Sequence, residues 1–375
     1  MLIDNNMSKS SKACMIATTP FQILGCISMV RQLKLDADLY IGDLFQNSAE
    51  VSQKLRDLHI FRNIILINER KIFDENVQSR VKKRLKQIPI YIKLDRTVES
   101  YLLEENYEQI YISNNTLICR LTYLYLFRKN SNIQIIYYDD GIGSYCNPKI
   151  MGISKIEQMY WILFVGPCTQ RITFGARLYA PGLYLDIMKN FHNFTSIDLI
   201  EPLQRLPEND AIMQAVFSVT KGCEISQNVV VLDTIRDVEF DQLGMKRIAS
   251  IYEYLNKRYR EKLIFKQHPK DFTEHAGYSY FRQRQMPFEA ISYFADLSEK
   301  ILLTNMSTAA FTPKMLFGQE PVIISLYGIM KEHRQGTNNF EKLFQNFREL
   351  YTDPKRIHMP KTEAELIELL DHYLL

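Results

Sequence analysis

Short apolar runs of strand length alternate with longer segments of helical periodicity along most of this 375-residue chain. Strands are expected at residues 14–18, 38–41, 64–67, 109–113 and 134–138, and again at 228–233, 262–266, 300–304 and 321–325. Helices are expected at residues 21–35, 48–58, 76–101, 117–128, 241–259, 287–295, 308–316, 338–346 and 363–373. Because strands that alternate with helices usually pair in parallel, the pattern predicts an α/β protein with parallel sheets.

The length and one interruption of the pattern predict two domains. The alternation loosens between residues 149 and 212, and residues 180–209 are expected to form a loop-rich connection. The expected N-terminal domain covers residues 1–195, with an interdomain segment to about 225, the C-terminal domain covers 226–345, and a C-terminal helical segment covers 346–375. We expect the two sheets to face each other across a central cleft, with ligands beyond the carboxyl ends of the strands.

The charge balance bears on the class of partner. The chain has 46 Lys and Arg against 43 Asp and Glu, a net charge of +3, which argues against a nucleic-acid binder. One basic run stands out on an expected helix, formed by Arg80, Lys82, Lys83, Arg84 and Lys86. This run is interpreted as a solvated face, with contact to anionic lipid or an acidic acceptor as the alternative.

The cysteines and the N-terminal segment bear on the compartment. The six cysteines are dispersed and have no metal-ligand spacing: Cys14, Cys26, Cys119, Cys146, Cys168 and Cys223. This pattern is typical of reduced, partly buried thiols. The uncharged stretch at residues 13–30 carries Thr18, Thr19, Pro20 and Gln22, which favours a strand, a turn and a helix over a signal peptide. We therefore expect a cytoplasmic protein, with peripheral contact to the inner face of the cytoplasmic membrane left open.

Two adjacent carboxylates leave the fifth expected strand and enter a Gly-x-Gly turn, as Asp139-Asp140-Gly141-Ile142-Gly143. Neighbouring residues of an extended chain point to opposite sides. One carboxylate can therefore face the cleft and accept a proton from a substrate hydroxyl, while the other braces the loop. The alternative is a plain turn, which Asp and Gly also favour.

Two candidates follow strands of the second half. Lys266, Gln267, His268 and Pro269 end the strand at 262–266, where an imidazolium can bind a phosphate and protonate a leaving group. The alternative for His268 is a structural histidine of the core. Ser307 and Thr308 follow the strand at 300–304 and are expected to cap a helix, a setting that also suits an anion.

Two acidic sites have less specific settings. Glu289 stands in the first turn of an expected helix, where it complements the helix dipole or accepts hydrogen bonds from ribose hydroxyls. The sequence Asp36-Ala37-Asp38 has the spacing of a DxD metal motif. It precedes a strand rather than following one, which favours a turn over a metal site.

Taken in order, the Asp-Asp-Gly, His-Pro, Pro-Phe-Glu and Ser-Thr elements resemble those of bacterial sialyltransferases, most closely glycosyltransferase family 52, which includes lipooligosaccharide sialyltransferases. The segment from Thr18 to Gln22 is also similar to the first strand-to-helix turn of that family, and the resemblance covers residues 13–325. It implies a GT-B arrangement of two Rossmann-like domains. The acceptor would bind to the N-terminal domain and the donor, CMP-sialic acid, to the C-terminal domain.

The resemblance also implies roles for individual residues. Asp139 would be the general base, and His268 would contact the donor phosphate and act as the general acid. Glu289 would bind the ribose, Ser307 and Thr308 the phosphate, and the backbone of Lys266 and Gln267 the cytosine, with Pro269 beside them. The loops around the acceptor would include Thr19, Pro20, Gln22, Asp140 and Gly141.

The chain departs from the family pattern at two places. Some members place the base after the first strand of the C-terminal domain, where this chain has Asp233 and Asp237, so both are alternative bases. Some relatives also carry a phosphate-binding serine before Phe-Glu, where this chain has Pro287.

The expected activity is an inverting, metal-independent transfer of sialic acid to a hydroxyl of an acceptor glycan, such as a terminal galactoside of lipooligosaccharide or capsule. No cofactor is expected; the partners are the nucleotide-sugar donor and an oligosaccharide or glycolipid acceptor. A homodimer is left open, and the apolar run at residues 159–165 is assigned to the core. The alternatives are a GT-B transferase that uses a nucleotide-hexose or CDP-glycerol, and a glycan-binding protein without catalysis.

Overall fold

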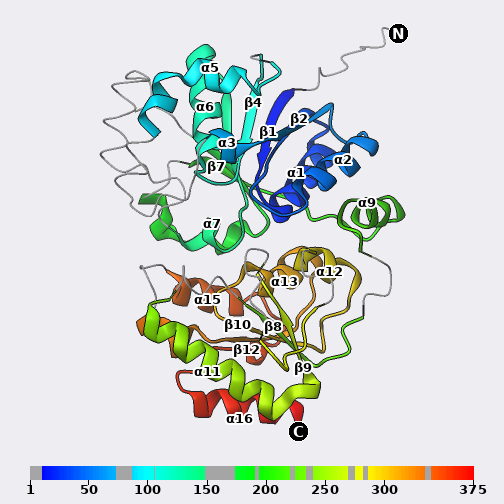
Figure 1. Cartoon of the computed structure of the whole chain (residues 1–375), viewed down its shortest axis with the longest axis vertical. Coiled ribbons are helices and arrows are strands. Elements are labelled where there is room, and N and C mark those ends of the chain that lie inside the picture. Colours follow the sequence, from blue (N-terminus) through cyan, green and yellow to red (C-terminus); the bar gives the residue numbers. More distant parts are fainter. Residues whose placement is uncertain are drawn as a thin grey trace, which may run out of the picture. The chain divides into compact units, whose positions relative to one another are not determined.

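The computed structural model describes residues 11–72, 87–104, 106–147, 174–190, 194–219, 224–233, 240–268, 275–281, 286–333 and 339–375. The chain divides into two compact units. Unit 1 comprises Met1–Asp140, Pro148–Pro181 and Asp186–Pro202, and unit 2 comprises Gly141–Asn147, Gly182–Leu185 and Leu203–Leu375. Each unit is built on its own sheet (Figure 1).

Unit 1 contains a sheet of seven parallel strands in the order β3-β2-β1-β4-β5-β6-β7. The strands are β1 (Lys12–Ala17), β2 (Asp36–Gly42), β3 (Asn63–Ile67), β4 (Gln109–Ile112), β5 (Gln134–Tyr138), β6 (Phe174–Leu178) and β7 (Phe194–Leu199). The strand order reverses direction between β1 and β4. In open parallel sheets, such a reversal is where ligands usually bind.

Helices connect these strands: α1 (Pro20–Leu33), α2 (Ser48–Asp57), α3 (Glu69–Ile72), α5 (Leu94–Glu99) and α6 (Leu117–Lys129). The short 3₁₀ helices η2 (Pro181–Leu183) and η3 (Asp186–Asn190) lie between β6 and β7. Helices α5 and α6 pack on one face of the sheet, where Leu94, Val98 and Leu121 join the core with Ile16 and Ile110 of the strands. Almost the whole of α6 is buried, which explains its weak amphipathic pattern.

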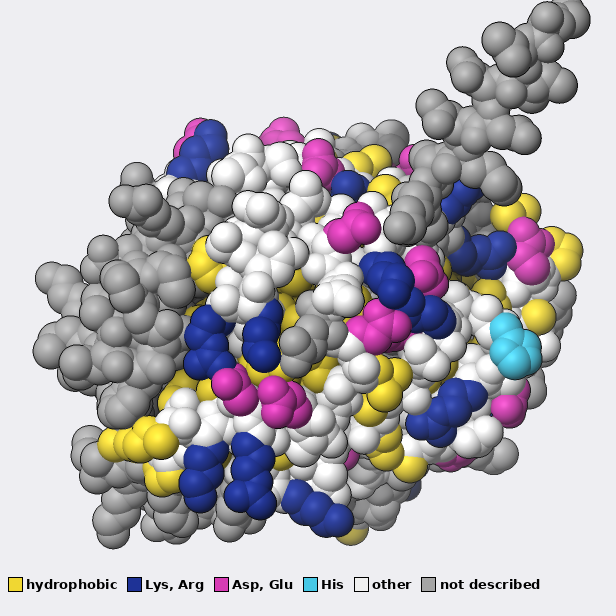
Figure 2. All heavy atoms as spheres, turned by 90° about the horizontal axis from the view of Figure 1, so that it is seen from above, with side chains coloured by type: hydrophobic (Ala, Val, Ile, Leu, Met, Phe, Trp, Pro, Cys, Tyr) yellow, Lys and Arg dark blue, Asp and Glu magenta, His cyan; other side chains and the backbone are white. Residues whose placement is uncertain are grey.

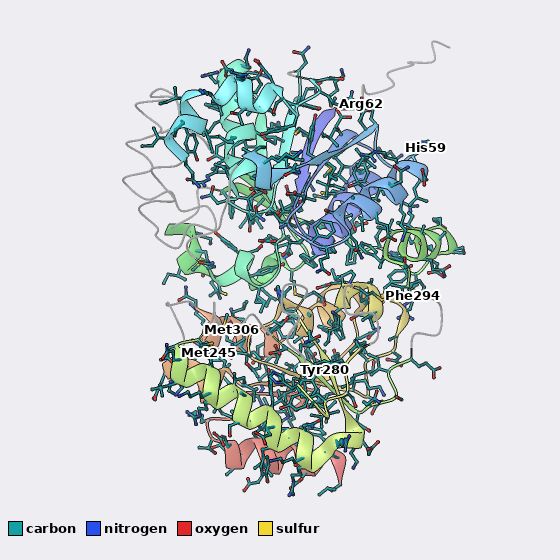
Figure 3. The ribbon with its side chains drawn as sticks, viewed as in Figure 1. His59, Arg62, Met245, Tyr280, Phe294 and Met306 are labelled. Atoms are coloured by element: carbon teal, nitrogen blue, oxygen red, sulfur yellow. The ribbon has the colours of Figure 1, made fainter. Side chains whose placement is uncertain are left out.

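Unit 2 contains five parallel strands in the order β12-β11-β10-β8-β9. They are β8 (Val229–Leu232), β9 (Leu263–Lys266), β10 (Ile301–Thr304), β11 (Val322–Ser325) and β12 (Ile357–His358). The order is that of a doubly wound fold, and its reversal lies between β8 and β10. Tyr280, labelled in Figure 3, adds an isolated parallel bridge to Phe265 of β9.

The helices of unit 2 are α7 (Gly143–Cys146), α9 (Pro207–Phe217), α11 (Gln242–Tyr259), α12 (Phe288–Phe294), α13 (Thr312–Phe317), α14 (Tyr327–Met330), α15 (Phe340–Arg348) and α16 (Glu363–Leu374). The 3₁₀ helices are η4 (Arg260–Lys262), η5 (Thr308–Ala310), η6 (Lys331–His333) and η7 (Pro354–Arg356). Helices α11 and α16 cover one face of the sheet (Figure 1). Leu366 and Leu370 of α16 lie in that core, with Leu369 and Tyr373 packed against it, so the helix expected at 363–373 packs on the sheet through one face.

These two sheets confirm the predicted class, an α/β protein with two Rossmann-like units. All nine predicted strands are present with small shifts at their ends. The predicted cleft between the sheets concerns their placement and stays a prediction.

Two expectations are corrected. The loop-rich connection expected at 180–209 contains β7, and β6 precedes it, so the sheet of unit 1 is two strands wider than predicted. Strand β7 lies at the sheet edge and has no buried residue, so it lacks the apolar run by which strands were identified. The turn expected at Asp36-Ala37-Asp38 is instead the start of β2, where Asp38 is buried.

Other expectations concern burial and the surface. Cys14, Cys26, Cys119 and Cys146 are buried, as predicted. On the face seen in Figure 2, basic and acidic side chains of the described residues are interspersed, as the near balance of charge suggests. No helix among the described residues combines the length and apolar character needed to cross a membrane. The basic run at 80–86, the apolar run at 159–165, Cys168 and Cys223 lie outside the described residues.

Candidate functional site

A polar network lies at the carboxyl edge of the unit 1 sheet, beside the reversal between β1 and β4. The Asn114 amide, after β4, donates to the Thr18 hydroxyl, after β1, at 3.1 Å. The Thr18 backbone N–H donates to Oε1 of Gln22 at 2.5 Å, and Nε2 of Gln22 donates to Oδ1 of Asp140 at 2.5 Å. Gln22 therefore connects the ends of β1 and β5.

The turn that begins α1 holds Gln22 in this position. Thr19 is the N-cap of α1, and its hydroxyl accepts from the Gln22 backbone N–H at 3.2 Å. Pro20 occupies the first helical position, where its missing N–H costs nothing. The helix cap at Thr19, the proline at the first helical position and the polar network of Gln22 thus explain three of the four residues in Thr19-Pro20-Phe21-Gln22. The Gln22 side chain is fully buried.

The two carboxylates of the Asp-Asp-Gly sequence differ in exposure. Asp139 is only 1% exposed; its N–H donates to the Arg177 carbonyl at 3.0 Å, and its Oδ2 accepts from the Tyr179 N–H at 3.0 Å. Asp140 is partly exposed and accepts from Gln22. One carboxylate braces the loop and the other is accessible, as the sequence predicts, but the bracing one is Asp139.

The carboxyl edge of the unit 2 sheet brings together the residues that follow β8 and β9. The Asp233 N–H donates to the Lys266 carbonyl at 3.0 Å, which extends the pairing of these strands by one residue. Asp233, Lys266 and Gln267 are buried, whereas His268 is partly exposed. His268 is thus the accessible member of this group. Asp237 and Pro269 lie outside the described residues.

A buried lysine and a buried glutamate occupy the same unit. Lys266 is 4% exposed and its Nζ donates to the Gln267 carbonyl at 3.2 Å. Burial lowers the pKa of Lys266 to about 8, and the charge of Glu289 partly opposes this shift. Glu289, in the first turn of α12, is 8% exposed; burial raises its pKa, while its own backbone N–H and the charge of Lys266 act to lower it. The positive charge of Lys266 and the negative charge of Glu289 therefore each favour the charged form of the other group, whereas burial disfavours both.

The end of β10 differs from the expected helix cap. Ser307 is the N-cap of the three-residue η5 and makes no side-chain cap bond. Its backbone N–H instead donates to the Thr304 hydroxyl at 2.9 Å, and α13 starts only at Thr312. The predicted helix at 308–316 is thus divided into η5 and α13, and neither is long enough to carry the proposed helix-terminal anion site.

Thr308 has a different partner. Its Oγ1 accepts from the Ile142 N–H at 3.2 Å, within unit 2. Gly141 lies against the same side chain: a Cβ on Gly141 would stand 2.4 Å from both Oγ1 and Cγ2 of Thr308. The φ angle of Gly141 is +87°, which also favours glycine. The glycine of Asp-Asp-Gly is therefore required by the chain's own packing.

Within unit 2, most of the residues predicted to bind the donor end or follow β9 and β10 of one sheet: Lys266, Gln267, His268, Ser307 and Thr308. The alternative base Asp233 follows β8, the strand between them. In unit 1 the structure brings Gln22 and Asp140 into contact, with Thr19 and Pro20 forming the turn. Sequence reasoning missed Asn114, Thr304 and Asn305, which lie at the same edges. Thr304 ends β10, Asn305 directly follows it, and Asn114 lies two residues after the end of β4, so inspecting the end of every strand would have found them.

Among the described residues, no group of three or more His, Cys, Asp or Glu side chains is arranged to hold a metal ion. The expected metal independence of the reaction stays a prediction.

No family model matches the chain, and no curated protein matches it. Among solved structures, it is similar to the UDP-GlcNAc 2-epimerase of Methanocaldococcus jannaschii in complex with UDP-GlcNAc and UDP, with 12% identity and a TM-score of 0.49 over 97% of this chain and 92% of that one. It is also similar to MurG of Acinetobacter baumannii, with 9% identity and a TM-score of 0.37 over 97% of this chain and all of that one.

Proposed function

We propose that the chain is an inverting sialyltransferase similar to glycosyltransferase family 52, which transfers sialic acid from CMP-sialic acid to a hydroxyl of an acceptor glycan. The observation that carries the proposal is that residues suited to binding a nucleotide-sugar lie in one unit, several of them at one edge of its sheet. His268 is accessible after β9, Ser307 and Thr308 follow β10, and Glu289 is buried in the first turn of α12, where the charge of Lys266 acts on it. Sequence motifs far apart in the chain therefore belong to one unit.

The residue types fit the chemistry of the donor. The bond between the anomeric carbon and the phosphate oxygen breaks, and its electron pair goes to the CMP phosphate. His268 neutralises or protonates that phosphate, and the hydroxyls of Ser307 and Thr308 donate to its oxygens. Glu289 accepts from the ribose hydroxyls, which requires an ionised carboxylate, and Lys266 supplies the nearby positive charge that favours this form.

The acceptor hydroxyl forms the new bond to the anomeric carbon and loses its proton to a carboxylate. We assign this base to Asp140 in preference to Asp139, because Asp139 is only 1% exposed whereas Asp140 is partly exposed. Direct displacement by the hydroxyl inverts the anomeric configuration. Asp233 stays an alternative base, although it is buried.

The reaction itself tests the proposal. The purified protein is incubated with CMP-sialic acid and lactose, and CMP release is followed together with NMR analysis of the product. We expect one new sialyl linkage of inverted configuration, and no turnover by the His268→Ala variant. The proposal is wrong if CMP-sialic acid is not consumed with any galactoside and CMP does not bind.

A transferase for another nucleotide donor, a nucleotide-hexose or CDP-glycerol, is the second candidate. It is favoured by the nature of the proposed contacts: His268, Glu289, Ser307 and Thr308 address phosphate and ribose, which many nucleotides share. Comparing the thermal stabilisation by CMP, CDP and UDP at equal concentration separates the two, since a ligand that binds the folded state raises its stability. The sialyltransferase predicts the largest shift with CMP.

A further inference from the structure

The hydroxyl of Thr308 joins two segments of unit 2 that are far apart in sequence. It accepts a hydrogen bond from the Ile142 N–H at 3.2 Å. Ile142 belongs to Gly141–Asn147, the piece of unit 2 that directly follows Asp139-Asp140 in the chain. A residue predicted to bind phosphate is therefore already bonded to the Asp-Asp-Gly loop.

The approach of the two segments is close and specific. A Cβ at position 141 would stand 2.4 Å from Oγ1 of Thr308, so only glycine permits this contact without displacement. The segment is a compact turn, since the Ser144 N–H donates to the Gly141 carbonyl at 2.9 Å and the Tyr145 N–H to the Ile142 carbonyl at 3.0 Å. At the C-terminal end of the segment, the Cys146 carbonyl accepts a hydrogen bond from the Asn339 N–H at 3.4 Å.

A hydroxyl can serve two partners at once. It accepts with a lone pair and donates with its single proton, so the bond from Ile142 leaves that proton for an anionic oxygen. Hydrogen bonds in such a chain polarise one another, so each bond strengthens the other. Phosphate binding and docking of the Gly141–Asn147 segment would then favour each other, as thermodynamic linkage requires.

We propose that Thr308 is a positioning residue that binds the donor phosphate and the Ile142 amide with the same hydroxyl, and so couples nucleotide binding to docking of the Gly141–Asn147 segment. This rests on the proposed function for the identity of the nucleotide. The link runs from Thr308 through Ile142 and Gly141 to the adjacent Asp140. Occupancy of the donor site thereby restrains the loop that carries the proposed base.

The test measures CMP affinity by calorimetry and the exchange rate of the Ile142 amide proton by NMR. In the wild-type protein, CMP should slow Ile142 exchange. Thr308→Ser keeps the hydroxyl and should preserve this effect, whereas Thr308→Val should abolish it. Gly141→Ala keeps the Thr308 hydroxyl, but its Cβ prevents the close contact between residue 141 and Thr308. This variant should therefore bind CMP about 5- to 10-fold more weakly, which is the lower range of coupling between sites.

Gly182→Ala is the matched control, because nothing lies within 4 Å of a Cβ at that position, and it should leave both readouts unchanged. The coupling is overturned if CMP binds but leaves Ile142 exchange unaltered, or if Gly141→Ala binds CMP as tightly as the wild type. If CMP does not bind, the CMP donor fails, and the same readouts are taken with UDP and inorganic phosphate. The coupling is also overturned if UDP or inorganic phosphate binds without changing the exchange rate of the Ile142 amide, or if neither ligand binds.

Discussion

Arg62 donates two hydrogen bonds to the carboxylate of Asp38, from Nε to Oδ1 at 2.9 Å and from Nη2 to Oδ2 at 2.6 Å. Arg62 is labelled in Figure 3 and immediately precedes β3, whereas Asp38 lies fully buried in β2. The Tyr107 hydroxyl and the Asn63 amide also donate to this carboxylate, at 2.6 and 2.9 Å. Asp38 of the Asp-x-Asp sequence therefore serves the interior of unit 1.

Asp38→Asn should destabilise the protein. The amide keeps the shape but removes the charge that accepts from Arg62, Tyr107 and Asn63. Arg62 is partly exposed and keeps its ion pairs with Asp36 and Glu104, so the cost is that of weakened buried hydrogen bonds, about 1–3 kcal/mol. Urea unfolding at pH 7 measures the loss; Glu50→Gln, which breaks the exposed Lys54–Glu50 pair, is the control and should cost under about 1 kcal/mol.

The same pair predicts a pH dependence. Burial acts to raise the pKa of Asp38, but the hydrogen bonds from Arg62, Tyr107 and Asn63 outweigh it, so the pKa lies below its ordinary value. The carboxylate then stabilises the folded state fully above the ordinary pKa of about 3.9, and this stability is lost as the pH falls through the lower folded value. The difference between wild type and Asp38→Asn should shrink below about pH 4; a constant difference would contradict this explanation.

Glu289→Gln should stabilise the nucleotide-free protein at neutral pH, by about 1–3 kcal/mol. Burial raises the pKa of Glu289, so its charged form costs stability above the folded pKa, and this cost disappears below the unfolded value. The gain over wild type, measured by urea unfolding, should therefore be present at pH 7 and absent near pH 4.

The same variant should lose nucleotide affinity, because the amide is a poorer acceptor for two ribose hydroxyls. Comparing CMP with its 2′-deoxy analogue isolates this contact. Wild type should prefer CMP, and Glu289→Gln should bind both alike. An unchanged preference would remove Glu289 from the proposed ribose site.

Asp140→Asn should lower kcat by about 10²–10⁴-fold with little change in stability, since its carboxylate is the proposed base. Asp139→Asn keeps an oxygen that can accept from the Tyr179 N–H. It should therefore retain most of the activity. Initial rates with CMP-sialic acid and lactose, measured for both variants, decide the assignment, and a larger loss at Asp139 would reverse it.

Gln22→Leu should reduce kcat more than it changes the KM for the donor, because Gln22 orients Asp140 without belonging to unit 2. The buried leucine also leaves the Thr18 N–H without its 2.5 Å acceptor, so a stability loss of about 1–3 kcal/mol should accompany the effect. Gln32→Leu, on the exposed C-terminal turn of the same helix, is the control. Equal rates for both variants would exclude Gln22 as a positioning residue.

The central strands could be predicted from sequence because both faces of each are buried. Strands β8 and β10 consist of the apolar runs VVVL and ILLT, with every residue buried. Edge strands β7 and β12 lack this signal, since β7 has no buried residue and β12 has only two residues. Their place in a sheet depends on the neighbouring strands, which a local pattern does not contain.

The candidate site was predictable in position but not in detail. The rule that parallel strands present their ends at one edge pointed to His268 and to Ser307-Thr308, which lie in the same unit, and their role in binding a donor stays a prediction. It could not tell which of Asp139 and Asp140 is buried, because that depends on the Tyr179 N–H, 40 residues away. The Asp38 interpretation failed for the same reason, since its partner Arg62 lies 24 residues further along the chain.

The chain enters unit 2 at Gly141, returns to unit 1 at Pro148, visits unit 2 again at Gly182–Leu185, and enters it finally at Leu203. No single cut can therefore separate the two units. A fragment that begins at Leu203 would lack Gly141–Asn147, and with it the Ile142 amide that bonds Thr308 and the Cys146 carbonyl that accepts from Asn339. When the ribosome completes unit 1 at Pro202, it has also synthesised Gly141–Asn147 and Gly182–Leu185 of unit 2, and these two pieces can pack in unit 2 only after Leu203–Leu375 has been made.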